Sequence, residues 1–246
     1  MQASSAHSLQ VEKSFEIGNR LLAALPPDEY DRLVPHLQTM PLPQGKVLYH
    51  PGDTIQEALF LDDGLVALRS TTADGTSLEV VSTGNEGVIG VPLILRSSVT
   101  AYEVVVQVAV TRAVKVKAEV LRTEFDRGGK LYDIMLRYTN LLLTQVSQSV
   151  ICNRFHSSEQ RLARSLLVAL ETANSKTVNL THETIAHMLG TRRTRVTMAA
   201  RILQQEELIG YSRGKITVLD RARLEEASCE CYGVVKENLD HFLSQL

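Results

Sequence analysis

Short apolar and β-branched runs separated by turn residues make up much of the first half of the chain. The runs at 59–69, 101–110 and 112–117 have the length and composition of strands. Turn residues lie between such runs, at 51–53, 62–64, 73–76 and 84–87. Asp74-Gly75 is a strong hairpin signal. We expect an α+β protein that begins with a small antiparallel β-roll of the jelly-roll type, because a parallel α/β sheet would alternate strands with long helices.

The pattern becomes helical after Gly129. Apolar and small polar residues then recur four and three positions apart, as in a coiled-coil seam: Leu131, Met135, Tyr138, Leu142, Gln145, Ser149 and Cys152. We expect the first six to form a dimer interface, although the core helix of a monomer would carry the same stripe. Ser157 and Gln160 are typical of a capping box that opens a further helix over 161–171. The long helix should therefore end near His156, with a hinge at 156–158.

Residues 181–220 have the pattern of a winged helix-turn-helix. A short helix is expected over 181–190, a second over 191–203, and two short strands around a turn that begins at Ser212. Thr181 and Thr191 are candidate N-caps. Gly190 can take the left-handed conformation that ends a helix.

The second helix of this unit separates apolar from basic residues. Its apolar positions, at helical spacing, are Val196, Ala199, Ala200 and Leu203. Its other positions are rich in arginine, and 191–203 contains no acidic residue. Because arginine matches the two acceptors of guanine in the major groove, we expect this helix to read DNA. The candidate DNA-binding residues are Thr181, Thr191, Arg192, Arg193, Arg195, Thr197, Arg201, Arg213 and Lys215.

Arg193 is the first candidate for a guanine contact, with Arg192 and Arg195 on flanking bases or phosphate. Arg213 and Lys215, on the expected wing, are candidate phosphate contacts, which position a protein without specifying sequence. A solvated basic helix in an unrelated fold is the alternative for an arginine cluster alone. The helix before it and the hairpin after it favour DNA binding.

Length and charge agree with a chain of several parts. With 246 residues, 44% of them hydrophobic, the chain can build more than one core. We expect a sensing domain over 1–125, a dimerisation helix and hinge over 126–157, and a DNA-binding domain with a C-terminal helix over 158–246. The net charge of the chain is −2, so the positive charge of the arginine-rich helix is a local feature and not a property of the whole molecule. We expect a cytoplasmic protein without membrane contact, because no leader pattern opens the chain and no apolar run is long enough for a span.

The three cysteines give no disulfide framework. Cys229 and Cys231 are too close for the usual zinc pair, and the sequence shows no second pair of ligands. We therefore expect reduced structural thiols and no bound metal or cofactor. An enzyme is not expected either, since no nucleophile elbow, phosphate-cradling loop or metal motif is present.

Roughly residues 20–220 resemble the Crp/Fnr family of bacterial transcription regulators. The resemblance is carried by 48–53, 60–66 and the block 185–216. It implies a homodimer that binds a palindromic DNA site and recruits or blocks RNA polymerase. It also implies that the β-roll holds a small effector against the dimer helices. The pocket residues expected from it are Ile89, Gly90, Val91, Tyr102, Val146 and Ser147.

The chain departs from the known sensor types of that family. Val88 stands where cyclic-AMP-responsive members have a glutamate, and the position of their phosphate-binding Arg-Ser pair falls near 101–102. Arg96 lies nearby but early. Because a buried phosphate without an arginine is an uncompensated charge, we do not expect tight cyclic AMP binding. No cysteine precedes Cys152 to hold an iron–sulfur cluster, and His50 is expected to be a turn residue, not a haem ligand.

The recognition helix also departs, with Thr194 in place of the family's glutamate and Met198 in place of an arginine. We therefore expect a half-site that differs from the family consensus. A ligand-sensing regulatory subunit without DNA binding is the alternative function, although it leaves the arginines of 192–201 without a purpose. Residues 224–243 predict an amphipathic helix that packs on the DNA-binding domain or extends the dimer contact, and packing is the simpler interpretation.

Overall fold

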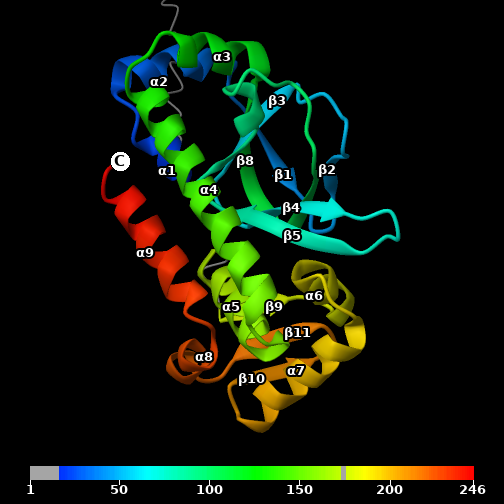
Figure 1. The fold of residues 1–246 in the computed structure, drawn as a ribbon. Helices are drawn as coiled ribbons and strands as arrows, with labels where there is room; N and C mark the ends of the chain where they lie inside the picture. Colours follow the sequence, from blue (N-terminus) through cyan, green and yellow to red (C-terminus); the bar gives the residue numbers. More distant parts are fainter. Residues whose placement is uncertain (1–16, 173–175) are drawn as a thin grey trace, which may run out of the picture.

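The computed structural model describes residues 17–172 and 176–246, in which a β-roll, a long helix and a helical C-terminal domain follow one another (Figure 1). The first sixteen residues, in which the sequence analysis expects no leader, lie outside the described residues. No helix among the described residues is long and apolar enough to span a membrane.

Two four-stranded antiparallel sheets form the β-roll, in the orders β1-β8-β3-β6 and β2-β7-β4-β5. Their apolar faces enclose a core that includes Leu42, Leu61, Val66 and Val106. The predicted roll is therefore confirmed. Its strands are β1 (Gln38–Leu42), β2 (Val47–Tyr49), β3 (Glu57–Leu61), β4 (Leu65–Thr71), β5 (Ser77–Thr83), β6 (Val88–Ile89), β7 (Glu103–Val108) and β8 (Val110–Lys117).

The predicted hairpin at Asp74-Gly75 joins β4 to β5 and projects from the roll (Figure 1). Gly75 has a φ of 83°, which favours glycine. The Asp74 carboxylate accepts hydrogen bonds from the Thr76 amide at 3.1 Å and from the Thr72 hydroxyl. Turn chemistry that can be read from the sequence therefore fixes this hairpin.

Short helices close one end of the roll. Leucines of the first two, Leu21, Leu22 and Leu33, are buried with Phe60 of β3 in the core beneath them. These helices are α1 (Arg20–Ala23), α2 (Pro27–Leu33), η1 (Val34–His36), η2 (Val91–Leu93) and α3 (Ala118–Asp126).

The long helix α4 (Lys130–Phe155) runs along the roll toward the C-terminal domain (Figure 1). The Glu29 carboxylate accepts hydrogen bonds from the Lys130 and Leu131 amides, at 2.8 and 2.9 Å, and so satisfies two free N–H groups at the helix start. After α4 ends, α5 (Ser158–Thr172) begins at once. The capping box is confirmed, since the Ser157 amide donates to Gln160 Oε1 at 3.0 Å and the Gln160 amide to Ser157 Oγ at 3.3 Å.

The expected dimer seam on α4 is wrong in its first half. Leu131, Met135 and Tyr138 are buried in the core of the protomer, where α4 packs against the roll and the N-terminal helices. The apolar side chains that α4 leaves exposed lie one position further along the helix and include Leu136, Leu143 and Val150. The sequence stripe is real, but it marks the inward face of the helix.

The C-terminal domain packs helices on a small antiparallel sheet of order β10-β11-β9. Leu166 and Leu170 of α5 are buried there with Ile185, Val196 and Ile216. Its further elements are β9 (Thr177–Asn179), α6 (His182–Leu189), α7 (Arg193–Gln205), β10 (Ile209–Ser212) and β11 (Lys215–Val218).

The end of the chain forms two helices, α8 (Arg221–Ala227) and α9 (Cys231–Leu243), instead of the single expected helix. Extended backbone at Ser228 separates them and turns Cys229 inward. Helix α9 then runs beside α4, and Phe242 reaches Tyr138 with ring centroids 6.1 Å apart (Figure 1). The expected packing on the DNA-binding domain therefore holds for α8, which packs against α5, whereas α9 packs mainly against the long helix.

The fold also overturns the expectation that the cysteine pair has no further ligands. Cys229 and Cys231 lie beside Cys152, in the last turn of α4, and His156, which caps that helix. One ligand atom of each of the four residues lies within 4.8 Å of those of the others. Sequence spacing missed this cluster because the second pair of ligands lies some eighty residues earlier in the chain.

Candidate DNA-binding surface and effector cavity

Helix α6 has the ends that the sequence predicts. Thr181 Oγ1 accepts a hydrogen bond from the Thr184 amide at 3.1 Å. Gly190 ends the helix with φ 55° and ψ 44°, in the left-handed region. A Cβ on Gly190 would lie 2.7 Å from Leu78 Cδ1, so this glycine also allows α6 to approach strand β5.

Helix α7 begins later than expected, and Thr191 is not its N-cap. Arg192 occupies the cap position without a side-chain hydrogen bond, and Arg193 is the first helical residue. The Thr191 amide instead donates to the Ala186 carbonyl at 3.0 Å, which completes the end of α6. Thr191 therefore belongs to the turn that ends α6 and does not cap α7.

The two faces of α7 divide as the sequence predicts. The four inward residues Val196, Ala199, Ala200 and Leu203 are buried. The outer face exposes four arginines of the predicted set: Arg192, Arg193, Arg195 and Arg201. Thr197 lies among them, and its hydroxyl contacts the Arg193 carbonyl at 3.1 Å and His182 Nδ1 at 3.0 Å.

The strands β10 and β11 form the wing, with Ser212 opposite Lys215 across the turn. Arg213 and Gly214 have φ of 48° and 81°, as a tight two-residue hairpin turn requires. Arg213 and Lys215 are exposed. A Cβ on Gly214 would lie 3.7 Å from Thr181 Cγ2, so the wing turn lies beside the start of α6.

The sequence analysis missed His182 and Tyr211 at this surface. Their rings stack, with centroids 4.5 Å apart and planes 8° from parallel. Burial lowers the pKa of His182 first, and the charge of Arg193 lowers it further. The stack joins the start of α6 to the wing, and no spacing rule connects two residues so far apart in the sequence.

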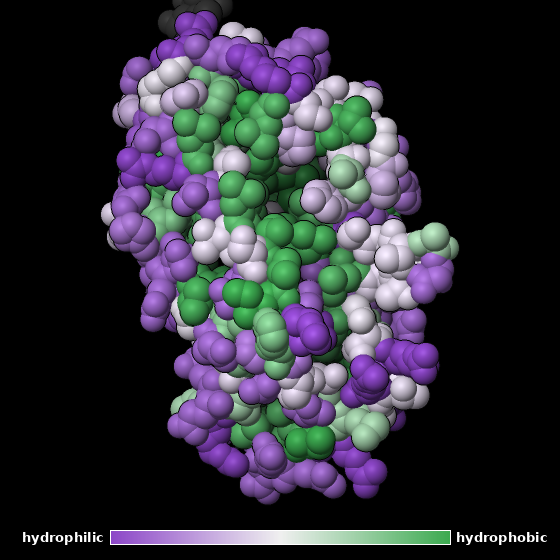
Figure 2. Space-filling model, viewed as in Figure 1, coloured by the Kyte–Doolittle hydropathy of each residue, from purple (hydrophilic) through white to green (hydrophobic). Residues whose placement is uncertain are grey.

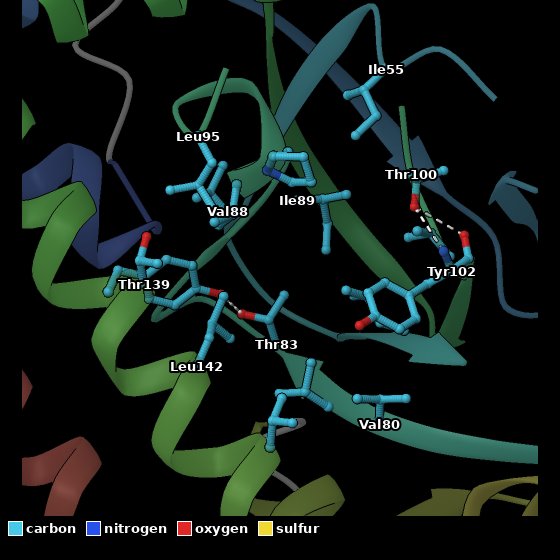
Figure 3. Close-up of a pocket in the computed structure, with 18 of the residues that line it drawn as sticks. Ile55, Val80, Thr83, Val88, Ile89, Leu95, Thr100, Tyr102, Thr139 and Leu142 are labelled. Atoms are coloured by element: carbon cyan, nitrogen blue, oxygen red, sulfur yellow. Dashed lines mark hydrogen bonds between the residues drawn. The ribbon is translucent and has the colours of Figure 1, made fainter. Parts of the chain in front are cut away.

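A cavity of about 210 Å³ lies between α4 and the β-roll (Figure 3). Its lining includes five of the six expected pocket residues: Ile89, Gly90, Val91, Tyr102 and Val146. Ser147 is not part of the lining; it is exposed, and its hydroxyl donates to the Leu143 carbonyl at 2.8 Å.

The lining of the cavity is apolar, and no described residue that lines it is charged. Its polar groups are hydroxyls of threonine and tyrosine, several of which are already paired. Tyr138 Oη and Thr83 Oγ1 are 2.6 Å apart (Figure 3). Burial raises the pKa of Tyr138, so this phenol is neutral. The Thr100 hydroxyl accepts from the Tyr102 amide at 3.1 Å.

Arg96 does not line this cavity. It is exposed and forms a bidentate ion pair with Asp126, at 2.8 and 3.0 Å. Val88, which the resemblance aligns with the glutamate of cyclic-AMP-responsive members, does line it. His50 lies in an exposed turn, where its amide donates to Asp53 Oδ2 at 2.7 Å, as expected.

The family model that matches this chain is the Crp-like helix-turn-helix domain, over residues 160–227. It coincides with most of the helical domain that carries α7 and the wing. The match to a DNA-binding domain agrees with the expectation that the chain is not an enzyme. A sequence search of curated proteins finds no match.

Solved structures share the fold over most of the chain. A Crp/Fnr-family regulator of Eubacterium rectale is 22% identical with a TM-score of 0.66, and the alignment covers 84% of this chain and 96% of that one. FixK2 of Bradyrhizobium japonicum is 15% identical with a TM-score of 0.67, covering 78% and 98%. CLP of Xanthomonas campestris, described as c-di-GMP responsive, is 15% identical with a TM-score of 0.64, covering 79% and 100%.

At these identities the likeness concerns the fold, while the family model concerns the DNA-binding domain itself. Residues 160–227 match the Crp-like helix-turn-helix domain, and most of the chain has the fold of the Crp/Fnr transcription regulators.

Proposed function

We propose that this protein is a homodimeric transcription regulator that reads a palindromic DNA site through α7. The observation that carries the proposal is the outer face of α7, which is exposed, basic and without an acidic residue in a matched helix-turn-helix domain. A helix of this kind enters the major groove and meets base edges with its first turn.

The surface divides into reading and positioning contacts. Arg193, the first residue of α7, is our choice for guanine, with Arg192 and Arg195 on flanking bases or phosphate. The wing residues Arg213 and Lys215 and the helix start at Thr181 lie together, where a phosphate backbone would pass. Because Thr194 replaces the family's glutamate, the half-site should lack the base that glutamate selects.

The exposed stripe on α4 supports the dimer. Leu136, Leu143 and Val150 are seven positions apart, the repeat of a coiled-coil seam, and all three are exposed. Figure 2 shows hydrophobic side chains along this face of the molecule. A second copy packed here would place two α7 helices on one DNA duplex, as a palindrome requires.

The cavity supports control by a small, uncharged and mainly apolar molecule. Leu143 contributes both to the exposed stripe and to the cavity wall, so a bound molecule would touch the dimer face. A cyclic nucleotide or a dinucleotide of the kind to which CLP responds would bring phosphate into a lining without a positive charge. That burial costs several kcal/mol, so tight binding of either is disfavoured.

A regulator of this kind acts in the cytoplasm, at promoters, where RNA polymerase would be its further partner. The resemblance supports these two assignments.

Selection of bound DNA from a random pool, by the purified full chain without effector, tests the proposal. Enrichment of a palindrome with half-sites about one helical turn apart would support it. No enriched motif, together with an absence of salt-dependent DNA binding, would favour a sensing subunit that does not read DNA. The selection should be repeated with a cell extract of small molecules, which separates an effector-dependent regulator from that alternative.

A further inference from the structure

The cluster at the hinge brings together every cysteine of the chain and one histidine. Cys152 lies in the last turn of α4, and His156 is the extended residue that caps the end of this helix. Cys229 and Cys231 flank Glu230 where the chain enters α9. The three thiols are buried, and a side chain from each segment contacts one from the other.

The donor atoms have the separations of a tetrahedral metal site. Cys152 Sγ lies 3.5 Å from Cys229 Sγ, and Cys231 Sγ lies 3.4 Å from His156 Nδ1. Around zinc, with Zn–S of about 2.3 Å and Zn–N of about 2.0–2.1 Å, ideal donor separations are about 3.5–3.8 Å. Four donors within 4.8 Å of one another can therefore bind one ion after small side-chain adjustments.

Two of the four donor side chains contact polar groups outside the cluster, as metal ligands in proteins commonly do. His156 Nε2, the ring nitrogen that points away from the cysteines, lies 3.1 Å from the Glu230 carboxylate. That contact favours the tautomer with a free Nδ1 lone pair. Gln148 Nε2 donates to Cys231 Sγ at 3.0 Å, which stabilises a thiolate. A cluster of buried thiols that served only as apolar packing would need neither partner.

Two arginines of α5 act on the cluster through their positive charge. Arg161 and Arg164 of α5 both interact electrostatically with Cys152. Three thiolates, a neutral histidine and a divalent cation carry a net charge of −1, which these guanidinium groups offset. The Arg164 Nε is buried and has no hydrogen-bond partner among the described residues.

We propose that Cys152, Cys229, Cys231 and His156 Nδ1 bind one Zn²⁺ as a closed structural site. A tetrahedral set of three sulfurs and one nitrogen, all from the protein, is the ligand set of structural zinc. The ion would tie the end of α4 to the start of α9, across the hinge that leads into the DNA-binding domain. Binding of zinc would then restrict how the DNA-binding domain can move relative to α4.

The test uses the full chain, purified under reducing conditions without chelator. We expect close to one zinc per chain by elemental mass spectrometry. Replacement by Co²⁺ should give a thiolate-to-cobalt charge-transfer band and the intense visible bands of a tetrahedral ion. Cys229→Ser and His156→Gln should lose most of the zinc, whereas His50→Gln, which changes an exposed histidine outside the cluster, should keep it.

A variant that keeps all four ligands guards against misfolding. Glu230→Gln should stay folded and bind zinc about 10- to 100-fold more weakly, as measured by competition with a chromophoric chelator. Wild-type chain that carries no zinc and gives no cobalt charge-transfer band would overturn the proposal. So would a Cys152–Cys229 disulfide in chain isolated without reductant, with no metal taken up after reduction.

Discussion

At the scale of single residues, Gly87 shows how closely the roll and α4 are joined. A Cβ built on it would collide with both Tyr138 Oη and Thr83 Oγ1. These two hydroxyl groups form a hydrogen bond with each other, and both residues line the cavity. The identity of one glycine therefore controls a contact between the β-roll and the long helix.

Gly87→Ala should destabilise the protein by about 1–3 kcal/mol, because Tyr138 must move and its buried hydroxyl loses Thr83. Urea unfolding followed by circular dichroism measures the loss. Gly233→Ala is the matched control, because this glycine lies in α9 with nothing within 4 Å of the added Cβ. Equal effects of the two changes would show that the close packing at Gly87 is not important.

Lys215→Gln should weaken binding to all DNA sequences about equally and lower the salt slope of binding by about one. The reason is that an exposed wing lysine contacts phosphate, whose counterions are released on binding. Titrations at several salt concentrations measure the slope. Lys46→Gln, an exposed change on the roll, should leave it unchanged. A changed base preference with an unaltered slope would instead make Lys215 a reading residue.

At the scale of elements, α4 shows what a hydrophobic pattern can and cannot specify. The stripe at 131, 135 and 138 is helical and apolar, yet it packs inside the protomer. Nothing in the spacing distinguishes a helix that packs on its own roll from one that packs on a second copy. The exposed stripe through Leu143 and Val150 emerges only once the roll and α9 cover the other faces.

Local chemistry was predictable, because caps and turns depend on residues close in sequence. The Thr181 cap, the Gly190 end and the capping box at Ser157 all form as expected. The start of α7 was misplaced by two residues because Thr191 completes the preceding turn. The cavity was found by resemblance, while the cluster around Cys152 needed tertiary structure, since its halves are 77 positions apart.

Val150→Glu should convert the proposed dimer to a monomer at micromolar concentration. Glutamate keeps the helix but places like charges opposite one another in an apolar seam. Analytical ultracentrifugation gives the mass directly. Val99→Glu, an exposed change in a loop of the roll, should remain dimeric. A dimeric Val150→Glu chain would place the interface elsewhere than on the exposed face of α4.

At the scale of the whole molecule, the winged domain contacts the roll as well as the hinge. Leu78 of β5 packs against Gly190, and Gln44 Nε2 donates to the Asn179 carbonyl at 2.7 Å. The cavity and the proposed zinc site lie at different points along α4. Helix α4 therefore connects the cavity, the proposed dimer face and the C-terminal domain.

Zinc should stabilise the whole chain by mass action. At a free concentration one hundred times the dissociation constant, a site that exists only in the folded state adds about 2.7 kcal/mol. Thermal unfolding in zinc buffers, with reductant present, should show the midpoint rising with free zinc for the wild type. Cys229→Ser should show no dependence. A midpoint independent of zinc in the wild type would indicate that the cluster has no structural role.

The most direct test of the account is the DNA motif that Arg193→Ala selects from a random pool, compared with the wild-type motif. Arg223→Ala, an exposed change on α8, is the control. We predict that the Arg193 variant loses preference at one position, symmetrically in both half-sites, with a cost of about 1–3 kcal/mol on the wild-type site. An unchanged motif with uniformly weaker binding would contradict the claim that the first turn of α7 reads the sequence.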